Sequence, residues 1–176
     1  MANTRLCLES TRLLVDRAKT YGTHQSYLSC LEEMVFLVPP NLPYYHAACL
    51  SVVTMTAADI LYNLFKPPLP SASPETRPKP MLIRGASSSV GICTVQVACT
   101  SGVQPIFVTA SPGRHHLLYE LGATRCFNFK SKTVILEIKD ALASFQGEAM
   151  AYALDAVGSH GTLDSGFWKT CRGLLF

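Results

Sequence analysis

Charged residues are scarce in this 176-residue chain: Asp, Glu, Lys and Arg together make up 15%, whereas 48% of the residues are apolar. This composition is typical of a chain that folds around a core, and it argues against disorder. The formal net charge of +3 is small and scattered, so we expect neither nucleic acid nor a membrane as a partner. No apolar run reaches the length of a membrane span, and the N-terminus lacks the apolar segment of a signal peptide.

The sequence also lacks any C-x-x-C pair, and its seven cysteines are odd in number. We therefore expect reduced, structural thiols in a cytoplasmic protein. The five histidines show no ligand spacing with the cysteines, so no metal site is predicted. No Ser/His/Asp, Cys/His or paired-carboxylate arrangement has a recognisable spacing, which argues against hydrolytic catalysis and leaves the catalytic residues unidentified.

The first 80 residues show no regular alternation of elements. Prolines are frequent between Lys66 and Pro80, six in 15 residues, and indicate an exposed loop. Upstream of it, Tyr44–Phe65 predicts a long, mostly buried helix with a break near Val52–Thr56. The segments before that helix predict an amphipathic helix over Thr4–Lys19 and two short strands over Ser26–Cys30 and Val35–Val38.

Beyond residue 81, strands alternate with helices, which predicts a parallel sheet with right-handed crossovers and flanking helices. The expected fold is therefore α/β and Rossmann-like, with its ligand crevice at the carboxyl ends of the strands. The expected strands are Met81–Arg84, Pro105–Ala110, Arg125–Phe129, Ala149–Leu154 and the start of a fifth at Leu174–Phe176. The expected helices are Ser89–Thr100, Gly113–Leu121, Thr133–Ser144 and Thr162–Thr170.

The stretch from Met81 to Gly91 organises this half of the chain. An apolar run ends there in a turn of small residues, and a helix follows, as in units that bind a dinucleotide pyrophosphate at a helix N-terminus. Aligned to the pattern G-x-G-x-x-G, the three glycine positions hold Ala86, Ser88 and Gly91, so one glycine is present. The alternative interpretation is an ordinary strand–helix turn.

The second strand ends without the acidic residue that usually binds the ribose of NAD about 20 residues beyond the glycine turn. Ser111 stands there, followed by Pro112, Gly113 and Arg114, and the first acid is Glu120. A hydroxyl with a guanidinium suits a 2′-phosphate, which favours NADP over NAD. The alternative is a capped helix start with Ser111 as N-cap and Pro112 as the first helical residue, and both can hold at once.

For several other polar residues we expect a structural or solvent-facing role. His115 and His116 begin a helix and are expected to face solvent or an anion, and His46 is expected to be a packing residue beside an apolar helix. Asp155 and Asp164 flank the turn after the fourth strand, at the edge where a ligand would bind, but Asp155 can equally cap the segment that follows. Tyr27 and Tyr152 are interpreted as sheet residues.

The turn Gly85–Gly91, together with Val108–Pro112, Leu121–Ala123 and Cys126–Phe129, resembles the cofactor domain of medium-chain reductases. Within that superfamily the sequence is most similar to the fungal trans-acting enoyl reductases, zinc-free alcohol-dehydrogenase relatives that partner polyketide synthases. Upstream, Gly22–Leu28 and Val38–Leu42 look like the end of the family's GroES-like catalytic domain, and Ala47–Ala58 resembles its interdomain helix. The implied divisions are 1–43, a remnant of the catalytic domain; 44–66, the interdomain helix; 67–80, the proline-rich loop; and 81–176, the dinucleotide-binding domain.

The resemblance implies NADP(H) as cofactor, hydride transfer to an α,β-unsaturated thioester on an acyl carrier, and no catalytic zinc. Cofactor-binding residues carried over by position are Ser87, Ser88, Ser89 and Val90 at the pyrophosphate, Ser111, Pro112, Gly113 and Arg114 at the 2′-phosphate ribose, and Phe129 near the adenosine. Phe129 stands where the family often has tyrosine and cannot donate a hydroxyl hydrogen bond. The segment Val53, Thr54, Met55 and Thr56 corresponds to part of the family's substrate wall.

Relative to that family the sequence is shorter at both ends, with one wall of the cofactor cleft absent. Hydride transfer needs both walls to hold the nicotinamide against the substrate. The alternative function is therefore a non-redox relative that binds a metabolite or partner, or that catalyses a cofactor-independent isomerisation or cyclisation. Apolar surface left uncovered by the shortening predicts a homodimer or poor solubility.

Overall fold

The computed structural model describes residues 5–7, 26–27, 32, 35–67, 79–145 and 150–158. By its internal contacts the chain divides into two units, Met1–Met55 and Thr56–Phe176. The division falls inside a helix, and each unit is described by itself.

In the first unit, strand β1 (Arg5–Cys7) pairs antiparallel with β2 (Val35–Leu37). The strand predicted over Val35–Val38 is therefore confirmed, whereas the helix predicted over Thr4–Lys19 is wrong at its start, because a distant strand partner there overrides the helical pattern. Ser26 and Tyr27 form a bend rather than the predicted strand. The rest of those two segments lies outside the described residues.

The long helix is present and has no break at Val52–Thr56. Helix α2 (Tyr44–Ala58) continues directly into the π-helix η2 (Asp59–Phe65). It is not mostly buried as predicted: Leu61 is buried, but the side chains of Tyr45, Val52 and Met55 are more than half exposed. Because apolar residues surround this helix on all sides, the sequence does not reveal which side is covered.

By length and composition alone this helix could cross a membrane, since Tyr44–Phe65 has 22 residues and a mean hydropathy of 1.5. The sequence-based expectation that no apolar run reaches that length is therefore wrong. One such helix is weak evidence for a membrane span, because the core helix of a soluble protein passes the same test.

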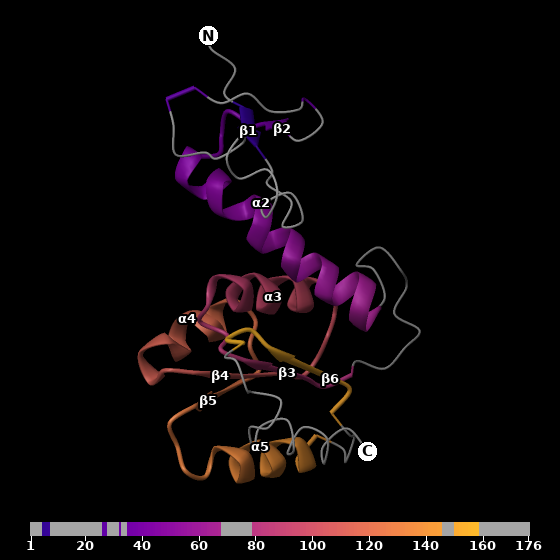
Figure 1. Cartoon of the computed structure of the whole chain (residues 1–176). Helices are drawn as coiled ribbons and strands as arrows, with labels where there is room; N and C mark the ends of the chain where they lie inside the picture. The colour runs from indigo at the N-terminus through magenta and orange to yellow at the C-terminus, as the bar shows by residue number, and fades with distance from the viewer. Residues whose placement is uncertain are drawn as a thin grey trace. The chain divides into compact units, whose positions relative to one another are not determined.

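The second unit contains a four-stranded parallel sheet in the order β5-β4-β3-β6, as Figure 1 shows. The strands are β3 (Met81–Arg84), β4 (Ile106–Ala110), β5 (Arg125–Asn128) and β6 (Tyr152–Asp155). Between them lie α3 (Ser89–Thr100), the 3-10 turn η3 (Pro112–Arg114), α4 (His115–Glu120) and α5 (Val134–Ala143). The Rossmann-like prediction is confirmed. The predicted helix Thr162–Thr170 and strand Leu174–Phe176 lie outside the described residues.

Helices cover both faces of this sheet (Figure 1), with α3 and α4 on one face and α5 on the other. Alternation along the strands divides the core in two. Met81, Ile83, Ile106 and Val108 pack with Leu61, Val95, Ala98 and Leu118, from η2, α3 and α4. Leu82, Phe107 and Phe127 pack instead with Ile138, Ala141 and Leu142 of α5. Burial on both faces explains the almost continuous apolar runs of β3 and β4.

The segment predicted as an exposed loop has buried ends. Pro67 at its start and Pro80 at its end are both buried, and Pro80 accepts hydrogen bonds from the Ala151 and Tyr152 N–H groups. Residues 68–78 lie outside the described residues.

Candidate functional site

The turn after β3 is fixed by the neighbouring strand. The Gly85 and Ala86 N–H groups both donate to the Thr109 carbonyl, at 3.1 Å each, and Gly85 adopts a φ of +72° that favours glycine. The Ser88 N–H donates back to the Gly85 carbonyl at 3.0 Å. The chain therefore leaves the sheet through a tight turn that points straight into α3.

The N-terminus of α3 is built to approach this turn closely. Ser88 is the N-cap, and its hydroxyl accepts a hydrogen bond from the Gly91 N–H at 3.1 Å. A Cβ added to Gly91 would lie 2.6 Å from the Gly85 carbonyl oxygen and 2.7 Å from the Ala86 Cα, so only glycine fits. Ser89 and Val90 occupy the first two helical positions, whose N–H groups have no partner within a helix.

The turn after β4 is exposed and polar. All four residues predicted there, Ser111 to Arg114, are exposed. Ser111 is the residue before η3 and Pro112 is its first residue, as predicted, but the Ser111 hydroxyl makes no capping hydrogen bond. Arg114 pairs with no carboxylate in the part of the chain that the structure describes. Both polar groups can therefore reach a ligand at this edge.

Phe129 follows β5 at the same edge. Its N–H donates to the Ala110 carbonyl at 3.4 Å, which places it beside the end of β4. The ring is 51% exposed, and the Lys130 ammonium lies 5.7 Å from its centroid. The strand register thus brings together at the carboxyl edge the turns that carry Ser87 to Val90, Ser111 to Arg114, and Phe129.

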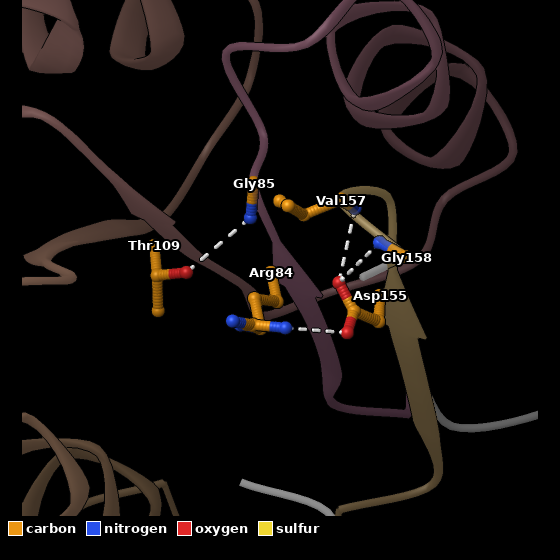
Figure 2. A network of polar contacts seen from close by, with 6 residues as sticks. All are labelled: Arg84, Gly85, Thr109, Asp155, Val157 and Gly158. Carbon is orange, nitrogen blue, oxygen red and sulfur yellow. Dashed lines mark hydrogen bonds and ion pairs between the residues drawn. The ribbon is translucent and has the colours of Figure 1, made fainter. Parts of the chain in front are cut away.

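The turn after β6 completes this edge, as Figure 2 shows. Asp155 pairs in register with Arg84, and its Oδ2 accepts a hydrogen bond from Arg84 Nη1 at 2.6 Å. Its Oδ1 accepts from the Val157 N–H at 3.0 Å and from the Gly158 N–H at 3.5 Å. The prediction that Asp155 caps the segment after it is confirmed, and the ion pair was missed. The sequence contained a signal for this pair. The strands β3 and β6, the first and fourth of the parallel sheet, end in residues of opposite charge, and such strands are neighbours in a doubly wound sheet.

Three further titratable groups, His115, His116 and Cys126, contact other parts of the chain. His115 Nε2 lies 3.3 Å from the Ala110 carbonyl oxygen, and exposed His116 lies 3.6 Å from the Glu120 carboxylate. Burial raises the pKa of the Cys126 thiol, and its hydrogen bond with Tyr119 offsets part of that rise. A raised pKa disfavours the thiolate, so this side chain is a poor nucleophile.

The residues predicted to form part of the substrate wall belong to a helix and not to the turns at the carboxyl edge of the sheet. Val53, Thr54, Met55 and Thr56 lie on α2, where Met55 is 64% exposed. Three of them belong to the first unit and Thr56 begins the second, so their role stays a prediction. Within the described residues, no three His, Cys, Asp or Glu side chains gather as a metal site would require.

Known proteins resemble this chain over most of its length. A family model described as zinc-binding dehydrogenase matches residues 89–170. The trans-enoyl reductase himH of Aspergillus japonicus is 35% identical over 149 residues, which are 85% of this chain and 42% of himH. The trans-enoyl reductase fsa3 of a Fusarium species is 29% identical over 140 residues, 80% of this chain and 38% of fsa3.

Solved structures resemble the same part. The CurK enoyl reductase is 25% identical with a TM-score of 0.64, over 81% of this chain and 38% of CurK. The apo JamJ enoyl reductase gives 25% identity and a TM-score of 0.64, over 83% of this chain and 39% of JamJ. The chain therefore spans about two fifths of the length of the proteins that it matches.

Proposed function

We propose that the chain belongs to the medium-chain dehydrogenase/reductase superfamily and that it is an NADPH-dependent enoyl reductase of fungal polyketide biosynthesis. The proposed substrate is an α,β-unsaturated acyl thioester carried by a partner polyketide synthase, and the proposed location is the cytoplasm. Two relatives named trans-enoyl reductases and two neighbours named enoyl reductases support the reaction class.

The observation that carries the proposal is the close packing of α3 on the glycine turn. Gly91 allows the helix N-terminus to approach the strand end, and the Ser89 and Val90 N–H groups lie where helix geometry leaves donors without partners. Such donors, with the positive end of the helix dipole, suit a pyrophosphate. The residues present therefore fit a dinucleotide.

Preference for NADPH is proposed to come from the turn after β4. Exposed Arg114 offers a guanidinium fork and exposed Ser111 a hydroxyl, and both groups suit a 2′-phosphate. Residues 111–119 include no acidic residue that would repel this phosphate. The first acid is Glu120, which lies 3.6 Å from His116. Phe129 offers an exposed ring beside the same turn for the adenosine.

When bound, NADPH supplies the hydride that adds to the β-carbon of the enoyl thioester. The role proposed for this chain's residues is to hold the nucleotide: Ser87 to Val90 at the pyrophosphate, and Ser111 to Arg114 at the phosphorylated ribose. The segment Val53 to Thr56 is proposed to line the acyl chain. No proton donor is assigned.

Titration of the chain with NADPH and NADH, followed by nicotinamide fluorescence, tests the proposal. We expect the chain to bind NADPH more tightly than NADH. Arg114→Ala should reduce this preference for NADPH about tenfold or more, because a charge-assisted contact is lost. Arg125→Ala is the matched control, since Arg125 is also an exposed arginine but lies at the start of β5, at the opposite, amino-terminal edge of the sheet.

Consumption of NADPH with an enoyl thioester then tests the reduction. A folded chain that binds neither nucleotide would contradict the proposed function. Binding of NADPH and NADH with equal affinity would contradict the role assigned to Arg114.

A further inference from the structure

The ion pair between β3 and β6 joins two turns of the proposed nucleotide site (Figure 2). Arg84 is the last residue of β3, directly before the glycine turn, and Asp155 is the last residue of β6. Their side chains are 28% and 5% exposed, so the Asp155 carboxylate is almost fully removed from water. A carboxylate buried to this extent is stable only if it is paired and hydrogen-bonded.

Asp155 satisfies that requirement with both oxygens. One oxygen binds the Arg84 guanidinium at 2.6 Å, and the other accepts from the Val157 and Gly158 N–H groups. The strands reinforce this arrangement, because the Ala156 N–H donates to the Arg84 carbonyl at 3.0 Å. The same carboxylate therefore fixes the end of β3 and the path of residues 156–158.

This fixed path places Val157 against the glycine turn. A Cβ built on Gly85 would overlap Val157 Cγ2, so the valine methyl group occupies the space beside the Gly85 Cα. The side chain of Val157 is nevertheless 56% exposed at the carboxyl edge. This apolar side chain therefore has one face on the turn and another face exposed.

We propose that Arg84 and Asp155 are positioning residues for the dinucleotide. They hold residues 156–158 so that Val157 and the glycine turn form one preformed surface beside the pyrophosphate position. The inference rests on the proposed function. Because Asp155 neutralises its charge, Arg84 acts through this pair and not as a phosphate ligand.

Preforming a loop raises affinity, since the free energy of ordering it is not taken from binding. Removing the pair should therefore weaken binding of the whole dinucleotide. It should not change the affinity for a ligand that contacts only the turn after β4. Adenosine 2′-monophosphate is such a ligand, because it carries the 2′-phosphate and has neither a 5′-phosphate nor the nicotinamide.

The experiment compares NADPH and adenosine 2′-monophosphate on the wild-type chain and on Asp155→Asn, Asp155→Ala and Arg84→Met. Asparagine keeps an oxygen for the Val157 N–H and loses the ion pair, whereas alanine loses both. We expect the affinity for NADPH to fall by about tenfold in Asp155→Ala and by less in Asp155→Asn, with the affinity for adenosine 2′-monophosphate unchanged within about twofold. Exposed Asp140 on α5 provides the control Asp140→Asn, expected to change neither ligand.

Amide hydrogen exchange at Val157 and Gly158 reports the turn without any ligand. Faster exchange in Asp155→Ala than in Asp155→Asn is expected, and the near-isosteric asparagine variant keeps the test valid if the alanine variant does not fold. Equal NADPH affinity in wild type and Asp155→Asn, or parallel loss of both ligands, would overturn the inference alone. A wild-type chain that binds neither ligand would overturn the proposed function and the inference with it.

Discussion

The turns on either side of the glycine turn use their polar groups in opposite ways. After β4, Ser111 and Arg114 are exposed, and neither caps nor pairs within the described residues. After β6, the side chain of Asp155 is only 5% exposed, and both of its oxygens are engaged with Arg84 and with backbone N–H groups. Groups without protein partners are available to a ligand, whereas groups that satisfy one another fix the backbone. The first turn is therefore suited to recognition and the second to support.

The largest expected effect comes from Gly91, where α3 packs on the glycine turn that lies between these two turns. Gly91→Ala places a methyl group 2.6 Å from a backbone oxygen and 2.7 Å from a backbone carbon, neither of which can move alone. We expect a loss of about 3 kcal/mol in the free energy of unfolding, measured by chemical denaturation.

Gly113→Ala is its matched control in the turn after β4, because nothing lies within 4 Å of an added Cβ there. It should leave stability within about 0.5 kcal/mol of wild type. Equal losses of stability in the two variants would contradict the contrast between a tightly packed position at Gly91 and an open turn at Gly113.

Arg84→Met should have the next largest effect. It leaves the Asp155 carboxylate, only 5% exposed, without its cation, and we expect a loss of about 2 kcal/mol in the free energy of unfolding. The double variant Arg84→Met/Asp155→Asn should recover part of this loss, since no unpaired buried charge remains.

Arg114→Ala should leave the free energy of unfolding unchanged, because exposed Arg114 supports no other residue. A destabilisation equal to that of Arg84→Met would show that the turn after β4 is structural too.

Substitution of Glu137 is expected to have only a small effect on stability, and this residue is an exposed counterpart to Asp155. Hydrogen bonds from Thr133 and Ser131 to its carboxylate lower its pKa in the folded chain. A lowered folded-state pKa contributes stability at neutral pH, and this contribution is lost as pH falls from the ordinary glutamate pKa through the folded value.

Glu137→Gln should therefore slightly lower the melting temperature at pH 7 and make no difference at a pH below the folded pKa. Melting curves of both proteins across the acidic range measure this. A difference that persists or grows at the lowest pH would contradict the role given to the carboxylate.

The sheet was predictable because burial on both faces gives β3 and β4 apolar sequences that end in turn residues. The glycine turn and Ser111 to Arg114 were predictable for a related reason, since a strand end followed by small or polar residues marks the carboxyl edge. Local sequence was sufficient for these elements.

Features that depend on distant partners were not predicted. Arg5–Cys7 is a strand because it pairs with Val35–Leu37, which no local pattern at the N-terminus reveals. The Arg84–Asp155 pair joins residues 71 positions apart in sequence and needs the strand order to be known. The exposure of Met55 and Val52 likewise depends on which elements cover α2, not on their apolar character.

The most direct test of the central claim is an amide chemical-shift titration of the isotope-labelled chain with NADPH. We expect perturbation of the amides of Ser89, Val90, Ser111, Gly113 and Arg114, with Val103 and Arg125 at the opposite edge of the sheet unchanged. Perturbation confined to other residues, or none at saturating NADPH, would contradict a nucleotide site at the carboxyl edge.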